Sequence, residues 1–131
     1  MKIRVVSSKD EILSVKSNER IVHLSFRPSM IDVLSLVRAC PKIETIQLSK
    51  SAFEKISKDV AIYCADQRIA IITGEVWGHR KDLNDYYEVP KFVLDRISAL
   101  KAGGVPTEDI ISEVVRKHRM SREQAEMIVK E

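Results

Sequence analysis

Four short segments rich in β-branched residues recur in the first part of the chain, and each begins with a basic residue followed by isoleucine. They start at Lys2, Arg20, Lys42 and Arg68, at intervals of 18, 22 and 26 residues. Branched side chains pack well on a pleated surface, so each segment is predicted to be a β-strand. Helical spacing of apolar residues separates them, which is typical of parallel strands joined by crossover helices. The repeat predicts an α/β fold with a small, four-stranded, mainly parallel sheet.

The apolar pattern within the strands bears on where the helices lie. Residues 69–74 are apolar on both faces, which predicts a central strand. Residues 21–26 and 43–48 alternate instead, so part of one sheet face is predicted to be less well covered. We expect a small doubly wound sheet. A solenoid-like arrangement with helices on one face only is the alternative.

Serines mark the expected helix starts in this region. Ser8, Ser29 and Ser51 each precede a helical pattern, and Ser51 is followed three residues later by Glu54, which is a capping-box spacing. The third helix is expected to follow Ser51 directly and to continue to Cys64. Pro41 is expected to end the second helix.

After Pro90 the pattern becomes purely helical. We therefore predict an α/β domain over residues 1–89 and a helical segment over residues 90–131, which packs on the first domain or forms a dimer contact. Gly103 and Gly104 end the first of three expected helices, and Ser121 begins the third. The order of a helix, a glycine-containing turn and two further helices resembles the helix-turn-helix of regulators and recombinases.

This resemblance has two departures. The stretch from Val115 to Ser121 is longer than the usual connection and contains no glycine, and the helix after Ser121 carries Glu123 and Glu126. Acidic residues that face phosphates weaken binding. The alternative is a helical bundle that buries its apolar faces. A basic cluster before the third helix is nevertheless placed to contact a nucleic-acid backbone; it comprises Arg116, Lys117 and Arg119, with Arg122 following.

Polar loops are expected at the carboxyl ends of the strands, where open parallel sheets bind ligands. Three of these loops combine a hydroxyl with a cation just before a helix, and helix N-termini attract anions. They contribute Lys9, Arg27, Ser29, Lys50 and Ser51. The pattern predicts an anion-binding edge of the sheet. The alternative is that the serines only cap helices and that the cations are solvated. The glycine-rich motifs of dinucleotide and P-loop sites are absent from the sequence.

The fourth loop gathers aromatic and basic side chains. Aromatic residues interleaved with cations stack on bases and hold phosphates, which makes Trp77, His79, Arg80 and Lys81 candidate nucleic-acid contacts. Alternatively, Trp77 and the tyrosines at 86 and 87 anchor a connection between two parts of the protein. His79 is also the best candidate for proton transfer, with Asp82 or Asp85 as a partner.

Composition excludes several classes of protein. The net charge of +3 is mild for a nucleic-acid binder, and no apolar run approaches the ~18–20 residues of a membrane-spanning helix. The N-terminal apolar stretch is too short for a signal peptide, so we expect a cytoplasmic protein. Two cysteines, Cys40 and Cys64, lie in apolar patterns, and we expect neither a disulfide nor a metal site nor a cofactor.

The chain resembles a family of small uncharacterised α/β proteins from methanogenic archaea. The phrases that carry the resemblance are MKIRVVSSK, NERIVHLSFRPS, CPKIETIQL and VWGHRKDLNDYY, and the similarity runs nearly from end to end. The resemblance implies a cytoplasmic archaeal protein. It implies no activity and no site residues.

The combined pattern favours a non-enzymatic, regulatory protein that binds nucleic acid, most simply as a homodimer. A sensor that binds a small phosphorylated ligand or nucleotide at the strand ends is the alternative, and an enzyme that uses His79 is a third hypothesis. The candidate nucleic-acid or phosphate contacts are Lys9, Arg27, Ser29, Lys50, Ser51, Trp77, His79, Arg80, Lys81, Arg116, Lys117, Arg119 and Arg122. No residue is assigned a catalytic role.

Overall fold

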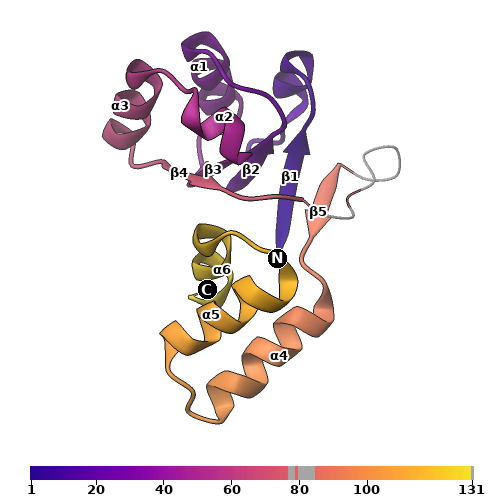
Figure 1. Cartoon of the computed structure of the whole chain (residues 1–131). Coiled ribbons are helices and arrows are strands. Elements are labelled where there is room, and N and C mark those ends of the chain that lie inside the picture. Colours follow the sequence, from indigo (N-terminus) through magenta and orange to yellow (C-terminus); the bar gives the residue numbers. More distant parts are fainter. Residues whose placement is uncertain (77–78, 80–84, 131) are drawn as a thin grey trace. The chain divides into compact units, whose positions relative to one another are not determined.

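The structure is a computed structural model, and it describes residues 1–76, 79 and 85–130. The chain forms two compact units, one from Lys2 to Tyr87 and one from Glu88 onward together with Met1. Figure 1 shows the elements of both units. The predicted candidates Trp77, Arg80 and Lys81 lie outside the described residues.

The first unit is built on a parallel arrangement of four strands. These are β1 (Lys2–Val6), β2 (Ile21–Leu24), β3 (Thr45–Leu48) and β4 (Ala70–Thr73), and adjacent strands pair in parallel. The register places Val22 beside Ile46 and Ile46 beside Ile71, so one apolar row crosses three strands. The predicted strand positions are therefore confirmed, and the fold is α/β.

The sheet has a fifth strand that the sequence analysis does not predict. Strand β5 (Tyr86–Glu88) lies beside β1, and the order is β4-β3-β2-β1-β5. The Val5 amide donates to the Asp85 carbonyl (2.8 Å) and the Val89 amide donates to the Met1 carbonyl (3.1 Å). Strands β1 and β5 therefore run antiparallel. The prediction of a four-stranded, mainly parallel sheet is wrong, because the sheet is five-stranded and mixed.

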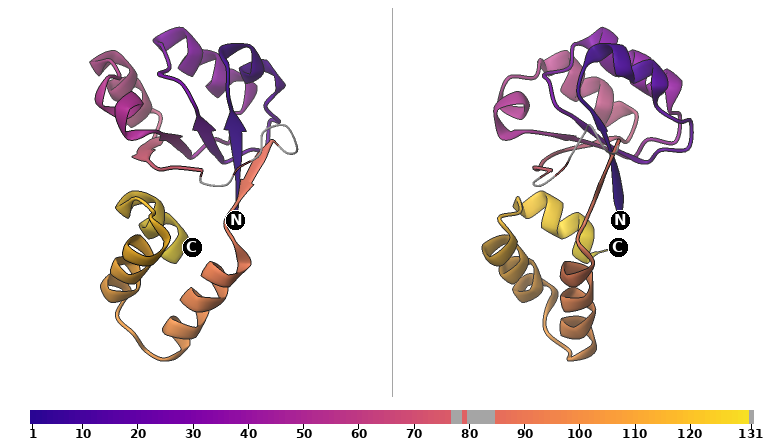
Figure 2. Two further views of the ribbon diagram at one scale, coloured as in Figure 1. Left: turned by 45° about the vertical axis from the view of Figure 1, so that its right-hand side comes forward. Right: turned by 90° about the vertical axis from the view of Figure 1, so that its right-hand side faces the viewer.

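All the helical segments of this unit cover one face of the sheet (Figures 1 and 2). They are the 3-10 helix η1 (Lys9–Ser14) and helices α1 (Met30–Ala39), α2 (Lys50–Glu54) and α3 (Lys58–Asp66). Each new parallel strand is added on the same side of the previous one, so right-handed crossovers return over the same face every time. The expected doubly wound sheet is wrong, and the one-faced alternative is correct.

The core of this unit lies between the sheet and these helices. Val22, Leu24, Ile46 and Leu48 point to the helix side and are at most 1% exposed. Strand β4, in contrast, lies at the sheet edge and is partly exposed, so the central position predicted for it is wrong. Its continuous apolar run reflects packing of Ile71 against the core rather than neighbours on both sides.

Serine caps position the helices, although not all at the predicted residues. Ser29 caps α1 as predicted, and it also forms a complete capping box with Asp32. The third predicted helix is two helices, with Ser49 capping α2 and Ser57 capping α3. The predicted cap at Ser51 is wrong, because the periodic apolar residues on both sides of Lys55 conceal the break between the helices.

The second unit contains three helices, α4 (Lys91–Ala102), α5 (Thr107–His118) and α6 (Arg122–Val129). Helix α4 packs against α5, and α5 packs against α6. Gly103 follows the end of α4 as predicted, and Ser121 caps α6 by accepting a hydrogen bond from the Gln124 amide. In the first unit, Pro41 follows the end of α1, also as predicted. In the part of the chain that the structure describes, no helix has the length and apolar character needed to cross a membrane.

Candidate functional site

A pocket opens at the carboxyl ends of the parallel strands. It has a volume of about 310 Å³ and lies where the loops after β1 and β2 meet the connection between α2 and α3. Parallel strands bring their carboxyl ends to one edge, which explains why residues far apart in the sequence meet there. The polar residues that line the pocket are Lys9, Arg27, Ser29, Lys55 and Ser57.

Three of the predicted anion-binding residues therefore come together, and two do not. Lys9, Arg27 and Ser29 line the pocket, whereas Lys50 and Ser51 do not. The Ser51 hydroxyl instead lies 3.3 Å from the Ser49 hydroxyl on the exposed first turn of α2.

Two pocket residues, Lys55 and Ser57, are absent from the sequence-based candidates. They lie in the connection between α2 and α3, which the sequence analysis assigns to the interior of one helix. The available signal was Ser57 followed by Asp59, since a serine before an acidic first turn is a helix start.

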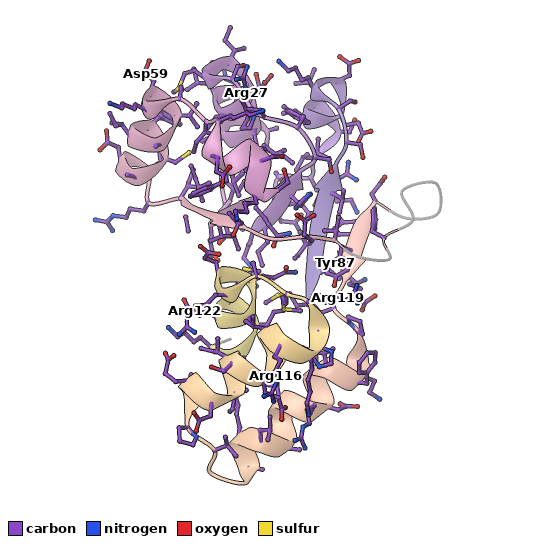
Figure 3. The ribbon with its side chains drawn as sticks, viewed as in Figure 1. Arg27, Asp59, Tyr87, Arg116, Arg119 and Arg122 are labelled. Atoms are coloured by element: carbon purple, nitrogen blue, oxygen red, sulfur yellow. The ribbon has the colours of Figure 1, made fainter. Side chains whose placement is uncertain are left out.

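The charges around this pocket are only partly compensated. The Lys9 ammonium lies 3.3 Å from the Asp32 carboxylate. Burial opposes ionisation of Asp32, but hydrogen bonds from Ser29 and the nearby Lys9 outweigh it and lower the pKa of this carboxyl. Within the described residues, Arg27 and Lys55 make no ion pair. Figure 3 shows Arg27 near the start of α1, with Asp59 apart from it on α3.

A buried polar group lies on the other face of the sheet. Gln47 Nε2 is 2.9 Å from His23 Nδ1, a distance at which the amide donates to the neutral ring. Burial, together with a smaller electrostatic effect of nearby His79, lowers the pKa of His23 to about 4. His79 thus lies near His23, and its Nε2 atom is buried and has no hydrogen-bond partner within the described residues.

Of the two predicted acid–base partners of His79, only Asp85 is among the described residues. The Asp85 carboxylate lies 2.9 Å from the Arg4 guanidinium, and Asp82 is outside the described residues. Within the described residues, no group of histidine, cysteine and acidic side chains is arranged to hold a metal ion. Cys40 and Cys64 are free thiols in the core, and burial raises the pKa of both.

The two tyrosines of the fourth loop belong to β5. The Tyr86 hydroxyl donates to Glu19 Oε1, and the Arg4 guanidinium lies 5.9 Å from the centre of the Tyr86 ring. Burial and the hydrogen bond to Glu19 raise the pKa of Tyr86 to about 12. Tyr87 is 8% exposed. Both rings therefore pack within the protein around β5, and neither is placed to stack on a nucleic-acid base.

The C-terminal cations fall into two groups. Arg116 and Arg119 are exposed at the end of α5 and have no acidic partner within the described residues. Arg122 is directed to Glu108 in the first turn of α5 and also pairs with Glu126 (3.1 Å). Figure 3 shows Arg119 and Arg122 on different sides of the helices. The predicted cluster is thus divided, and Arg122 is already compensated.

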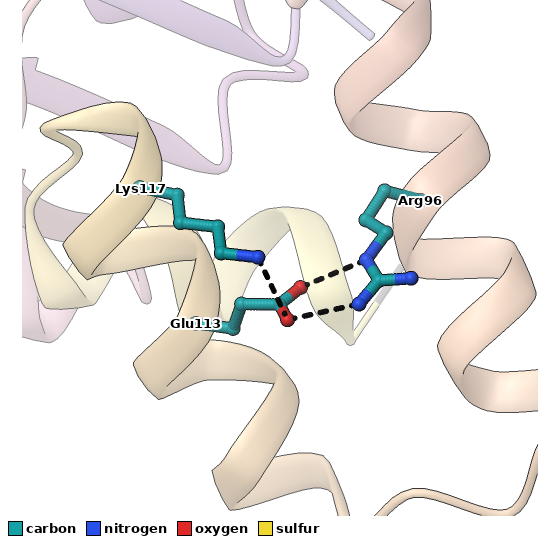
Figure 4. Close-up of polar contacts among 3 residues, drawn as sticks. All are labelled: Arg96, Glu113 and Lys117. Atoms are coloured by element: carbon teal, nitrogen blue, oxygen red, sulfur yellow. Dashed lines mark hydrogen bonds and ion pairs between the residues drawn. The ribbon is translucent and has the colours of Figure 1, made fainter.

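Lys117 is only partly compensated by an acidic residue. Its ammonium is 3.4 Å from Glu113 Oε1, and the same carboxylate accepts two hydrogen bonds of 3.1 Å from the Arg96 guanidinium (Figure 4). This network joins α4 to α5 and leaves Lys117 half-exposed beside Arg116. A second contact between α4 and α5 is made by the exposed ring of Phe92, which lies 5.7 Å from the ring of His118.

The connection between α5 and α6 is short. Helix α5 continues to His118, so only three residues, Arg119 to Ser121, separate it from α6. Arg119 adopts a left-handed conformation (φ 52°, ψ 40°), which is the conformation that a glycine usually supplies in such a turn. In the sequence, the stretch from Val115 to Ser121 is longer than the usual connection. The connection itself is short because α5 extends one turn beyond Val115.

Two models of protein-family domains match the chain. Residues 2–85 match the model of the N-terminal domain of a family of unknown function, DUF1699, and residues 93–123 match that of its C-terminal HTH domain. The chain belongs to the DUF1699 family. No curated protein and no solved structure matches it.

The two DUF1699 matches correspond to different parts of the chain. The N-terminal match covers the sheet through β4 and the pocket, and the C-terminal match covers most of α4, all of α5 and the first two residues of α6. The resemblance to an uncharacterised α/β family is therefore confirmed. The archaeal source that the resemblance implies stays a prediction.

Proposed function

We propose that this DUF1699 protein binds double-stranded DNA through its C-terminal unit. The observation that carries the proposal is the match of residues 93–123 to a helix-turn-helix domain. Helix-turn-helix proteins place one helix in the major groove and fix it by contacts to the flanking phosphates. The three-residue connection between α5 and α6 supports this reading.

The phosphate contacts are proposed for the end of α5. Arg116 and Arg119 are exposed and uncompensated, and Lys117 is beside them. Each cation that neutralises a phosphate releases a counterion and contributes to affinity. Arg122 is left out of this set because binding a phosphate would require it to leave Glu108 and Glu126.

A double variant that removes two positive charges tests the proposal. In the double variant R116Q/R119Q, affinity for a duplex DNA should fall roughly 50-fold at ~100 mM salt, since each lost phosphate contact removes nearly one unit of salt slope. Fluorescence anisotropy measures the affinity, and circular dichroism checks that the variant is folded. Both side chains are exposed, so the fold should be unchanged.

A control is K42Q, which removes one exposed cation from the α/β unit. Its affinity for DNA should equal that of the wild type. If R116Q/R119Q binds DNA as tightly as the wild type, the proposed surface is wrong. If K101Q, in the last turn of α4 before the α4–α5 connection, is the variant that loses affinity, the interface lies on that connection instead.

We extend the proposal to a regulatory, cytoplasmic homodimer. Two free buried thiols support a reducing compartment. Exposed apolar side chains support self-association; Leu13 is 81% and Ile31 is 74% exposed, and both line a shallow pocket of about 220 Å³. Sedimentation equilibrium measures this state, and a monomer at high concentration would contradict it.

A further inference from the structure

We propose that the pocket at the carboxyl ends of the parallel strands binds a small phosphorylated ligand. This inference goes beyond DNA binding, since it concerns the α/β unit, which matches a separate domain of the family. The pocket is concave and, at about 310 Å³, has the size of a small-molecule site.

Three cations from separate parts of the sequence converge on this pocket. Lys9 comes from the start of η1, Arg27 from the connection after β2, and Lys55 from the connection between α2 and α3. Gathering three cations around one cavity raises the electrostatic energy of the folded protein unless an anion compensates them. Asp32 compensates Lys9, and within the described residues Arg27 and Lys55 have no acidic partner.

The side chains that line the pocket have the chemistry of a phosphate site. An arginine fork and two ammonium groups match the several oxygens of a phosphate, and the pocket also contains the hydroxyls of Ser29 and Ser57. These serines already accept hydrogen bonds from the first turns of α1 and α3, so the helix ends alone would not make a site. The uncompensated cations carry the inference, and the positive ends of two helices add to their field.

The lining of the pocket also restricts the rest of the ligand. The only apolar side chains among the described lining residues are Pro28 and Met30, and the lining includes no aromatic ring. A base therefore has no stacking platform here, whereas single-stranded nucleic acid is usually held by such platforms. The pocket fits a compact phosphate ester or diphosphate better than a nucleic-acid strand.

The test uses inorganic pyrophosphate as the probe and the full-length chain. Isothermal titration calorimetry should show saturable binding with a dissociation constant of about a millimolar or tighter. The variants R27Q and K55Q should each weaken binding about tenfold, as expected for loss of one charge-assisted contact. Lys55 is exposed, so K55Q tests the site even if R27Q perturbs the fold.

Two controls separate this inference from the proposed DNA interface. K42Q lies outside the pocket, and R116Q/R119Q removes the cations of α5; both should bind pyrophosphate as the wild type does. In amide NMR spectra, pyrophosphate should shift signals of the pocket residues, including Ser29 and Ser57. The inference is overturned if no saturable binding is seen up to about 10 mM.

It is also overturned if pyrophosphate shifts only signals around Arg116 and Arg119. That result would leave the DNA proposal intact, because the anion would then be occupying a phosphate position of the DNA interface. Conversely, the wild-type protein could bind pyrophosphate at Arg27 and Lys55 and fail to bind DNA. That result would contradict the proposed function and support the inference about the pocket.

Discussion

His23 shows how a single buried residue ties stability to pH. Its ring is 3% exposed, it accepts a hydrogen bond from Gln47, and its pKa is lowered from 6.5 to about 4. Between these two values the unfolded chain binds more protons at this residue than the folded chain does. Stability should therefore be complete above about pH 6.5 and should decrease as the pH falls towards 4.

The variant H23Q should remove this part of the pH dependence. In the wild type the residue accounts for a loss of roughly 3 kcal/mol between pH 6.5 and pH 4. Urea unfolding at several pH values measures the free energy of unfolding. The expected result is a flatter profile for H23Q than for the wild type, and equal slopes in the two proteins would contradict it.

Individual residues also show what the sequence could and could not predict about the site. Lys9, Arg27 and Ser29 were predictable, since each follows a recognisable strand. Lys55 was not, because its role depends on a break between helices that the apolar spacing conceals. The pairing of Arg122 with Glu108 depends on how α6 lies on α5, which residue types alone do not specify.

At the scale of elements, the Arg96–Glu113–Lys117 network sets how much charge α5 can offer. Replacing Glu113 by glutamine removes one negative charge next to the basic end of α5 and releases Lys117. The variant E113Q should bind duplex DNA roughly twofold more tightly at low salt, the size expected for one screened charge. Anisotropy measures the affinity, and the melting temperature should change little because both cations that pair with Glu113 are half-exposed.

The control for this prediction is D109N, which makes the same charge change in the first turn of α5. Arg119 is ten residues away along the helix, or ~15 Å at the usual rise per residue. A smaller gain of affinity in D109N than in E113Q is expected. Equal gains would mean that the net charge of the protein, rather than the local network, controls binding.

The elements themselves were predictable where local chemistry dominates. The four parallel strands follow from their β-branched runs, and the start of α1 follows from the position of Ser29 before a helical apolar pattern. Strand β5 was missed because three residues, Tyr86 to Glu88, give no readable alternation. The edge position of β4 was missed because an apolar run records burial and not the number of neighbouring strands.

At the scale of the whole molecule, one chain combines an α/β unit that has an anion-attracting pocket with a helical unit that matches a helix-turn-helix domain. The predicted boundary after residue 89 stays a proposal, and the compact units divide after Tyr87. The net charge of +3 was a poor guide, since it conceals uncompensated cations at both places. Which cations are uncompensated is a property of the fold.

The salt dependence of DNA binding tests the central claim most directly. For the wild-type protein, the logarithm of the binding constant should fall linearly with the logarithm of salt concentration, with a slope of about −2 to −3 for contacts by Arg116, Arg119 and Lys117. Anisotropy titrations of one labelled duplex from ~50 to ~200 mM salt give this slope. A failure to bind at the lowest salt, or an affinity that does not change with salt, would contradict the account.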